Sequence, residues 1–237
     1  RLPRANDIAL RRGGELLYLP AHFEESRSEL LHMLIRRHPL GLLVSHGAGG
    51  LQANSVPFLI DPEPAPWGTL RAHVARANPV WREAEGEVLV AFQGPQAYVS
   101  PGWYPSKADH GKVVPTWNYV MVQARGGLRA IEDAAWLDAL VTRLTTVHEA
   151  TQAKPWAVDD APPAFVDTML RAIVGIEIEL TSLTGKWKVS QNRSAADREG
   201  GLRAEQRGGA RAQQHRHRVA GGVRRNEIGA AVAVDVR

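Results

Sequence analysis

Alternating apolar and polar positions predict that this chain contains more strands than helices. Residues 39–60 show a strand, a glycine-rich turn and a second strand, which is the pattern of a β-hairpin. Further strands are predicted over 69–79 (a short strand running into a helical turn), 87–94, 114–126 and 176–180, and residues 184–193 close the patterned region. In the strand 114–126 the alternation places Thr116, Asn118, Val120 and Val122 on one face and Trp117, Tyr119 and Met121 on the other.

Helical periodicity is predicted for three longer segments. Residues 26–38 begin with Ser26 as the expected N-cap, and Glu29 follows three residues later, as in a capping box. Residues 133–150 repeat apolar side chains at helical spacing. Residues 162–174 begin with proline and are expected to stop at Gly175.

These elements predict an α+β fold built on an antiparallel sheet or small barrel, with helices packed outside, because short turns join most of the strands. Residues 1–16 show no clear period and are expected to form a loose N-terminal extension. Residues 17–193 are expected to form one domain. Residues 194–237 are rich in Arg, Gly and Ala without a sustained period, so little fixed structure is expected there.

The net positive charge of the chain comes entirely from its last segment. Residues 1–193 contain 20 Lys and Arg against 20 Asp and Glu, whereas residues 194–237 contain nine Arg against five acidic residues. Such a tail can bind nucleic acid, or it can simply be disordered, which is the more common case. Residues 132–171 hold seven acidic and three basic residues, a balance that argues against a DNA-reading helix pair in that region.

Composition excludes several classes of protein. The chain has no Cys, which excludes a disulfide framework, a thiolate nucleophile and Cys-based metal sites. No apolar run approaches the length of about 18 residues that a membrane span needs, and the first residues lack the pattern of a secretion signal. A helix with His148 and Glu149 begins like a zinc-protease helix, but Gln152 stands where the second His is required. We therefore expect a cytoplasmic protein with no membrane segment and no bound metal.

Aromatic side chains are concentrated in residues 98–120. Five of the eleven Trp and Tyr residues of the chain lie there, together with Lys107 and Lys112 and the polar side chains of Ser100, Thr116 and Asn118. Rings and prolines offer flat walls, and lysines offer charge to a phosphate, so the stretch suits a planar, partly apolar, anionic ligand. A loop that packs on its own aromatic residues explains the composition equally well.

Two further segments contain groups that suit a phosphate or a heterocycle. In "HVARANP", a strand leads into a helical turn with His73, Arg76 and Asn78, where exposed amides and a guanidinium can hold a phosphate. In "GKWKVSQNR", Gln191 or Asn192 can hydrogen-bond the amide edge of a heterocycle. An arginine on a solvated face and a polar strand end are the corresponding structural explanations.

Taken together, six motifs resemble those of the PaiB family, whose members are described as FMN-binding negative transcriptional regulators. The motifs cover residues 17–193 and are "YLPAHF" (18–23), "AHVARANPVW" (72–81), "FQGPQAYVSPGWYPSK" (92–107), "VPTWNYV" (114–120), "AIVGIEIELT" (172–181) and "GKWKVSQNR" (185–193). The resemblance implies an FMN-binding split β-barrel, related to pyridoxamine phosphate oxidases, that forms a homodimer with FMN between the subunits. Family members continue past the last motif with a short helical segment, which the pattern after residue 193 does not suggest in this chain.

The resemblance also implies which side chains contact FMN. The phosphate is expected at His73, Arg76 and Asn78, with Arg71 in reach. The remaining expected contacts are Ser100, Trp103, Tyr104 and Lys107 in the aromatic loop, Thr116, Trp117 and Asn118 in the next strand, and Lys186 and Gln191 in the closing motif. A role in transcription follows from the family alone, and direct DNA binding would need the basic tail or a dimer surface. An FMN-dependent oxidoreductase of a small molecule and a flavin-binding sensor are the alternatives, and no catalytic constellation is evident.

Overall fold

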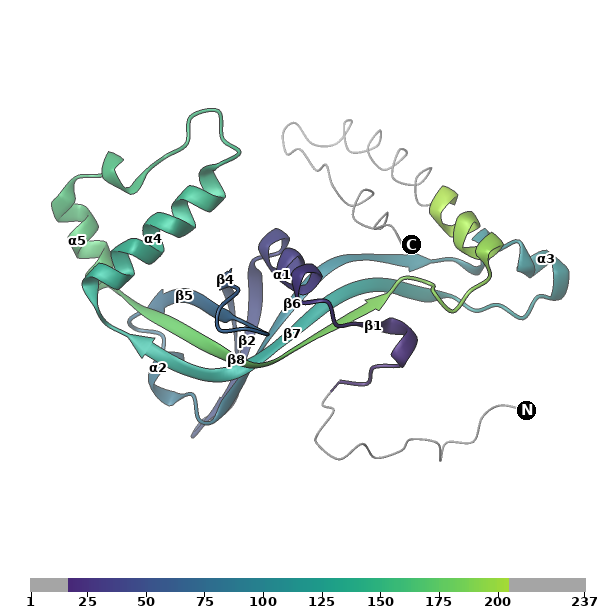
Figure 1. Cartoon of the computed structure of the whole chain (residues 1–237), viewed down its shortest axis with the longest axis horizontal. Coiled ribbons are helices and arrows are strands. Elements are labelled where there is room, and N and C mark those ends of the chain that lie inside the picture. The colour runs from purple at the N-terminus through teal and green to yellow at the C-terminus, as the bar shows by residue number, and fades with distance from the viewer. Residues whose placement is uncertain (1–16, 205–237) are drawn as a thin grey trace.

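The computed structural model describes residues 17–204 (Figure 1). The strands are β1 (Glu24–Glu25), β2 (Leu40–Gly47), β3 (Gly50–Pro57), β4 (Leu59–Asp61), β5 (Thr69–Ala75), β6 (Glu87–Val99), β7 (Thr116–Ile131) and β8 (Ile173–Lys188). The helices are α1 (Ser28–Arg37), α2 (Val80–Glu83), α3 (Ser106–His110), α4 (Ala134–Glu149) and α5 (Pro163–Arg171), with short 3-10 turns at Ala21–Phe23, Pro101–Trp103 and Val158–Asp160. Residues 195–204 are also helical.

One antiparallel sheet connects all the strands, in the order β3-β2-β6-β7-β8-β5-β4, with β1 paired to β8. The sheet curls until β3 contacts β5, although the two strands lie far apart in this order. The side-chain amide of Asn78, just after β5, donates a hydrogen bond of 2.9 Å to Asn54 Oδ1 on β3 across this junction. The predicted α+β fold, an antiparallel split barrel with peripheral helices, is confirmed.

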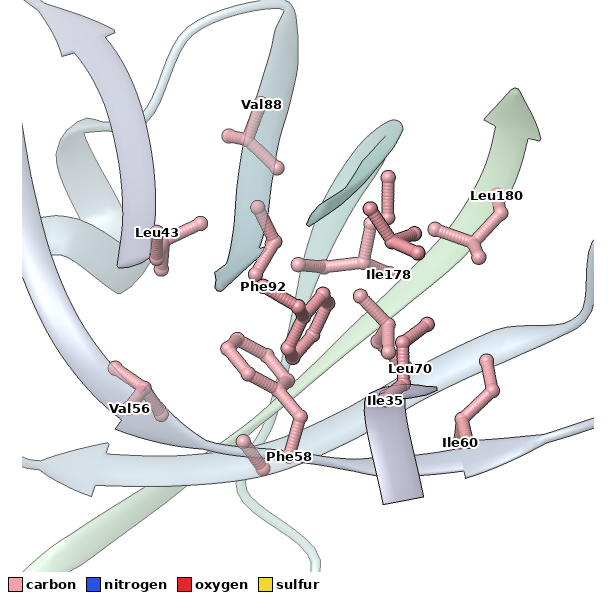
Figure 2. Packing of buried hydrophobic residues seen from close by; sticks show 14 of the residues in the cluster. Ile35, Leu43, Val56, Phe58, Ile60, Leu70, Val88, Phe92, Ile178 and Leu180 are labelled. Carbon is pink, nitrogen blue, oxygen red and sulfur yellow. The ribbon is translucent and has the colours of Figure 1, made fainter. Parts of the chain in front are cut away.

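The barrel is filled by apolar side chains from the inner faces of strands β2 to β8 and from α1 (Figure 2). Phe58 and Phe92 meet edge to face, with ring centroids 5.9 Å apart and an interplanar angle of 78°. On α1, Leu31 and Ile35 lie four residues apart and point into the same core. The helix therefore plugs one side of the barrel, as its apolar periodicity predicts.

β6 and β8 are much longer than the sequence pattern indicated, and β7 ends at Ile131 where the prediction ended at residue 126. β6, β7 and β8 continue past the barrel as a three-stranded arm, and α3 lies near its far end (Figure 1). The register shifts between Gln93 and Gln96 and between Arg125 and Gly126, which are the irregularities that bend a strand. At Gly126 a Cβ atom would lie 2.1 Å from the carbonyl oxygen of Glu179, so only glycine fits this close approach.

Several predicted boundaries were wrong. Ser26 is not the N-cap of α1: Arg27 takes that position without a side-chain cap, and its backbone N–H donates to Glu25 instead. Gly175 does not stop α5, which ends at Arg171, but lies inside β8, where a Cβ atom would come within 2.3 Å of the Trp136 ring. The expectation of little structure after residue 193 was wrong for the helix at 195–204. The segments 1–16 and 205–237 lie outside the described residues.

The helices α4 and α5 form a lobe away from the arm (Figure 1). Leu140 and Leu144 of α4 pack against Leu59 of β4, and Arg143 pairs with Asp61 at 2.6 Å, which holds the lobe to the sheet. Across residues 17–204, none of the helices has the length and apolarity that crossing a membrane requires.

Candidate functional site

A small pocket lies where β7 begins and β8 ends, on the arm. Its volume is about 40 Å³, and it is lined by Thr116, Asn118, Lys188, Ser190, Asn192 and Arg193. Two of these six side chains are cationic, the other four are hydroxyls or amides, and none is acidic. This donor set suits an anion that accepts several hydrogen bonds.

The local fold brings these side chains together. Strand pairing sets Lys188 opposite Tyr119, which places the end of β8 beside the start of β7. The chain then turns at Ser190, a buried residue with φ of 67°, in the left-handed region that costs free energy for a residue other than glycine. The Ser190 hydroxyl donates to Asn118 Oδ1 at 3.0 Å, and the backbone N–H of Arg193 donates to the Ser190 carbonyl at 3.0 Å. A strained residue held by two hydrogen bonds is typical of a functional turn.

Positive charge dominates this end of the arm. Burial, together with the nearby charges of Lys186 and Arg193, lowers the pKa of the Lys188 amino group. Lys188 Nζ donates only to neutral groups, the Thr116 hydroxyl and the Trp117 carbonyl, each at 2.5 Å. Within residues 17–204 neither Lys186, Lys188 nor Arg193 forms an ion pair. An anion in the pocket would relieve this repulsion.

Lys186 lies next to the pocket but does not line it. It is 6% exposed, its Nζ donates to the Tyr18 carbonyl at 2.6 Å, and the Tyr18 and Tyr119 rings lie 5.3 and 5.7 Å away. Gln191 has a supporting role, because its side-chain oxygen accepts from Val189 N at 2.7 Å and its nitrogen donates to the Trp187 carbonyl. Of the two residues predicted from the closing motif, Gln191 therefore supports the turn from outside the pocket, whereas Lys186 adds positive charge beside it.

Large aromatic surfaces are exposed at the same end of the arm. Tyr98 and Trp117 are 48% and 52% exposed, and their rings meet edge to face with centroids 6.2 Å apart. As the alternation predicts, Trp117 lies on the opposite face of β7 from the buried Val120. These two rings offer a flat apolar surface to a ligand.

The aromatic loop (residues 98–113) makes contacts both within itself and with the residues that follow β8. Ser100 Oγ accepts a hydrogen bond of 3.1 Å from the Gly102 backbone N–H, and Lys107 is exposed on α3. Trp103 is half-buried, whereas Tyr104 is buried and carries the guanidinium of Arg193 over its ring, 5.1 Å from the centroid. The Tyr104 hydroxyl is buried without a hydrogen-bond partner within residues 17–204. Buried hydroxyls are normally satisfied, so a polar partner is expected at this position.

The residues predicted to hold the phosphate, which are Arg71 and those of the "HVARANP" motif, lie away from this pocket in the structure. Arg71 forms ion pairs with Asp61 and Glu177 across neighbouring strands. Asn78, besides its contact with Asn54, accepts a hydrogen bond of 3.0 Å from the Val80 backbone N–H. β5 pairs with β8 only over its first part, from Ile173 to Glu179, whereas the pocket lies at the end of β8, so these side chains do not join the pocket within one chain.

Arg76 also has a structural role. Its guanidinium donates to the carbonyl oxygens of Arg171 and Ile173, at 2.8 and 3.0 Å, and it pairs with Glu132. It thereby fastens the link between α5 and β8.

Arg76→Ala is expected to lower the free energy of unfolding by about 1–2 kcal/mol, because two carbonyl oxygens lose their donors. Glu132→Ala removes only the exposed ion pair and should cost less than about 0.5 kcal/mol. Urea unfolding of both variants measures the difference. Equal effects would mean that the carbonyl contacts contribute nothing.

His73 is the titratable group most affected by burial at the base of the lobe. Its Nδ1 is buried without a partner in the described part of the chain, and burial lowers its pKa from the ordinary value of 6.5. It lies on β5 opposite Gly175, whose Cα is covered by Trp136 of α4. The ring is therefore expected to stay neutral in the folded protein.

This burial predicts a pH dependence of stability. When folding lowers the pKa of a histidine, its contribution to the free energy of unfolding is complete above the pKa that it has in the unfolded chain. That contribution is lost as the pH falls through the pKa that it has in the folded protein. Wild type should lose more stability than His73→Leu between about pH 7.5 and pH 5.5, above the range where Asp61 and Glu177 titrate. Urea unfolding at both pH values tests this, and parallel losses would contradict it.

Of the thirteen residues predicted as FMN contacts, Thr116 and Asn118 line the pocket, whereas Tyr104, Trp117, Lys186 and Gln191 lie around it. Asn192, which the sequence suggested as an alternative to Gln191, also lines the pocket, whereas Lys188, Ser190 and Arg193 were not predicted. The signal was present, because all three belong to the closing motif that already supplied Lys186 and Gln191.

Comparisons with known proteins show to which family the chain is similar. Residues 17–182 match the family model described as "Putative FMN-binding domain". The chain is 31% identical over 186 residues to the protease synthase and sporulation protein PAI 2 of Bacillus subtilis, with 76% of this chain and 85% of that protein covered. It is 35% identical over 221 residues to a protein of Emericella nidulans described as uncharacterized, with 78% and 88% covered.

Solved structures share the fold at low sequence identity. The flavocytochrome Anf3 of Azotobacter vinelandii superposes with a TM-score of 0.55 at 9% identity, covering 78% of this chain and 79% of that one. A conserved hypothetical protein of Mycobacterium tuberculosis gives a TM-score of 0.52 at 12% identity, covering 75% and 94%. The family match and the relatives above 30% identity carry the assignment: the chain belongs to the PaiB family, whose shared domain is described as "Putative FMN-binding domain".

Proposed function

We propose that this protein binds FMN with the phosphate in the pocket at the end of β8. One observation carries the proposal. Lys188 and Arg193 line the pocket together with hydroxyl and amide groups, and no lining residue is a carboxylate. A phosphate monoester carries a charge of about −1.5 to −2 near neutral pH, which two cations and several donors match. Arg71 and Arg76 are assigned to structure instead, since both already have partners.

The rest of the cofactor requires surface outside the pocket. A volume of about 40 Å³ holds a phosphate-sized group and not a flavin ring. Tyr98 and Trp117 offer flat apolar area at the same end of the arm, and the unpartnered hydroxyl of Tyr104 offers a hydrogen bond. When bound, FMN supplies one- and two-electron redox chemistry, and the protein supplies binding and orientation.

An absorption titration tests this proposal. The purified protein, before and after addition of FMN, should show a flavin spectrum shifted from that of free FMN. Because the phosphate is held by charge, affinity should fall as salt rises. A colourless preparation that takes up no FMN would overturn the proposal.

A homodimer is part of the proposal, supported by an uncovered apolar face on the hairpin of β2 and β3. Leu40 and Leu42 alternate with buried residues and are 63% and 43% exposed, and Leu51 across the hairpin is 77% exposed. Exposed leucines on one hairpin are typical of an interface.

Leu42→Asp is therefore expected to shift the protein from dimer to monomer, since a charge would be buried at the interface. Sedimentation velocity measures the state, and Lys154→Asp, which introduces the same side chain on the distant lobe, is the control. A wild type that sediments as a monomer would exclude the dimer.

We propose that the bound flavin serves negative transcriptional control, as the PaiB resemblance implies. The excess positive charge of the chain lies in residues 194–237, so direct DNA binding is expected to depend on them. A salt-dependent gel-shift assay should compare the full chain with residues 1–204, which keep the helix at 195–204. Lost binding after truncation would assign the contact to the removed residues, and no binding by either form would contradict a direct DNA role.

An FMN-dependent oxidoreductase is the competing function. The lining residues include no carboxylate or imidazole, so proton transfer would have to use Lys188 or the flavin itself. Oxidation of NAD(P)H by flavin-loaded protein, with an identified acceptor, would favour this function.

A further inference from the structure

The pocket is completed by a C-terminal strap, residues 189–204, which supplies three of its six lining residues: Ser190, Asn192 and Arg193. The strap leaves β8 at Lys188, makes the strained turn at Ser190 and continues into the helix at 195–204. Its position relative to the arm therefore decides where the Arg193 guanidinium lies.

The strap is fastened to the aromatic loop by a buried carboxylate. Asp197 is 4% exposed, and its two oxygens accept hydrogen bonds from Ser106 N at 3.2 Å and from Ser106 Oγ at 2.8 Å. The backbone N–H of Asp197 donates in turn to Ser194 Oγ at 3.2 Å, which caps the helix. In many helices an acidic residue at this position reaches back to its own N-cap. In this helix the carboxylate instead bonds a segment 91 residues away in sequence.

Close packing adds a second connection. A Cβ atom at Gly200 would lie 2.3 Å from the Trp103 carbonyl oxygen and 3.1 Å from Pro105 Cδ, so the helix approaches the loop as closely as glycine allows. The Arg193 guanidinium rests on the Tyr104 ring, which fixes the plane of the cation. Four contacts thus join the strap to residues 103–106 of the loop.

We propose that the aromatic loop is an anchoring platform for the strap, and that Asp197, Ser106 and Gly200 are positioning residues that hold Arg193 in the phosphate pocket. The ligand in this inference rests on the proposed function, whereas the docking of the strap does not. Two of the side chains that give the loop its composition, Tyr104 and Pro105, lie against the strap. Loss of the anchor should leave the barrel intact and weaken anion binding.

The test uses Asp197→Ala and Gly200→Val in the full chain. Glu199→Ala is the matched control, because it removes the same charge from the same helix and breaks only an exposed pair with Arg203. Hydrogen exchange without ligand should rise over residues 189–204 in both test variants and stay unchanged in the control. FMN should bind about 10-fold more weakly to the test variants, as expected when charge-assisted hydrogen bonds that preorganise a site are lost.

A double-mutant cycle separates positioning from general loosening. If Asp197 acts through Arg193, Asp197→Ala should cost little affinity in a protein that already carries Arg193→Ala. Full additivity, or faster exchange with unchanged FMN affinity, would overturn the inference.

The two proposals can fail separately. If wild type takes up no FMN, titration with inorganic phosphate measures the same pocket, and a phosphate affinity that falls in Asp197→Ala keeps the positioning role. If neither FMN nor phosphate binds, both the anion site and the positioning role are wrong. If exchange over 189–204 is already as fast in wild type as in the variants, the anchor is wrong whatever binds.

Discussion

Lys188→Met and Arg193→Met are each expected to weaken FMN binding by about 10- to 100-fold, the value of a charge-assisted hydrogen bond expressed as affinity. Both side chains line the pocket, and within residues 17–204 neither forms an ion pair whose acidic partner would be left alone in the variant. Methionine keeps much of the length and apolar stem of the side chain, so the change removes charge more than packing. Fluorescence titration of apoprotein with FMN gives the dissociation constants.

Riboflavin makes this test specific for the phosphate. It carries the same ring without the phosphate, so wild type should prefer FMN and both variants should lose most of that preference. Lys107→Met is the control, since Lys107 is exposed on α3 and does not line the pocket. A variant that binds both ligands equally more weakly would have a disturbed ring site, and the phosphate assignment would then be wrong.

The same experiment decides between two positions for the phosphate. If Arg76→Ala, rather than the pocket variants, lost the preference for FMN over riboflavin, the "HVARANP" turn would be the phosphate site. That outcome would require the turn to meet a flavin held by a partner subunit, because β5 and the pocket do not meet within one chain. With the phosphate at Lys188 and Arg193, we expect Arg76→Ala to change stability and leave the preference intact.

Local pattern was enough to predict most of the fold. Alternation in 114–126 separates Val120 and Val122 from Trp117, because a strand has only two faces. In the structure the two valines are buried and Trp117 is exposed. The alternation failed for the length of β8, because it predicts a strand only over residues 176–180, whereas β8 continues from Thr181 to Lys188. Those positions continue the ladder with β7 on the arm, where partner strands and not a core define the element.

The site was harder to predict, because its members depend on non-local pairing. Lys188 and Arg193 stand in the motif that drew attention to Lys186 and Gln191, but only the register of β7 with β8 shows which of these face the pocket. Likewise, nothing near Arg76 indicates its partner Glu132, 56 residues away. The sequence shows that a guanidinium is present, and the fold decides whether it binds a ligand or pairs with a carboxylate.

Phe92→Ala is expected to cost about 3–5 kcal/mol of the free energy of unfolding, a larger loss of stability than Arg76→Ala should cause. Phe92 is 0% exposed and packs edge to face on Phe58 at the centre of the barrel (Figure 2). It also lies on β6, which links the hairpin of β2 and β3 to the arm, so the cavity would weaken the junction between them. Urea unfolding measures the loss, and Phe165→Ala on α5, where the ring is 54% exposed, is the matched control.

The control should stay within about 0.5 kcal/mol of wild type, because an exposed ring gains little from folding. Near the unfolding midpoint of Phe92→Ala, the flavin should be released together with the fold. If the arm kept its FMN while the barrel had unfolded, the three strands would be an independent unit, and the barrel core would not be what positions the site. We expect a single transition for both, since β6, β7 and β8 run without interruption from the core around Phe92 to the strands that carry the pocket.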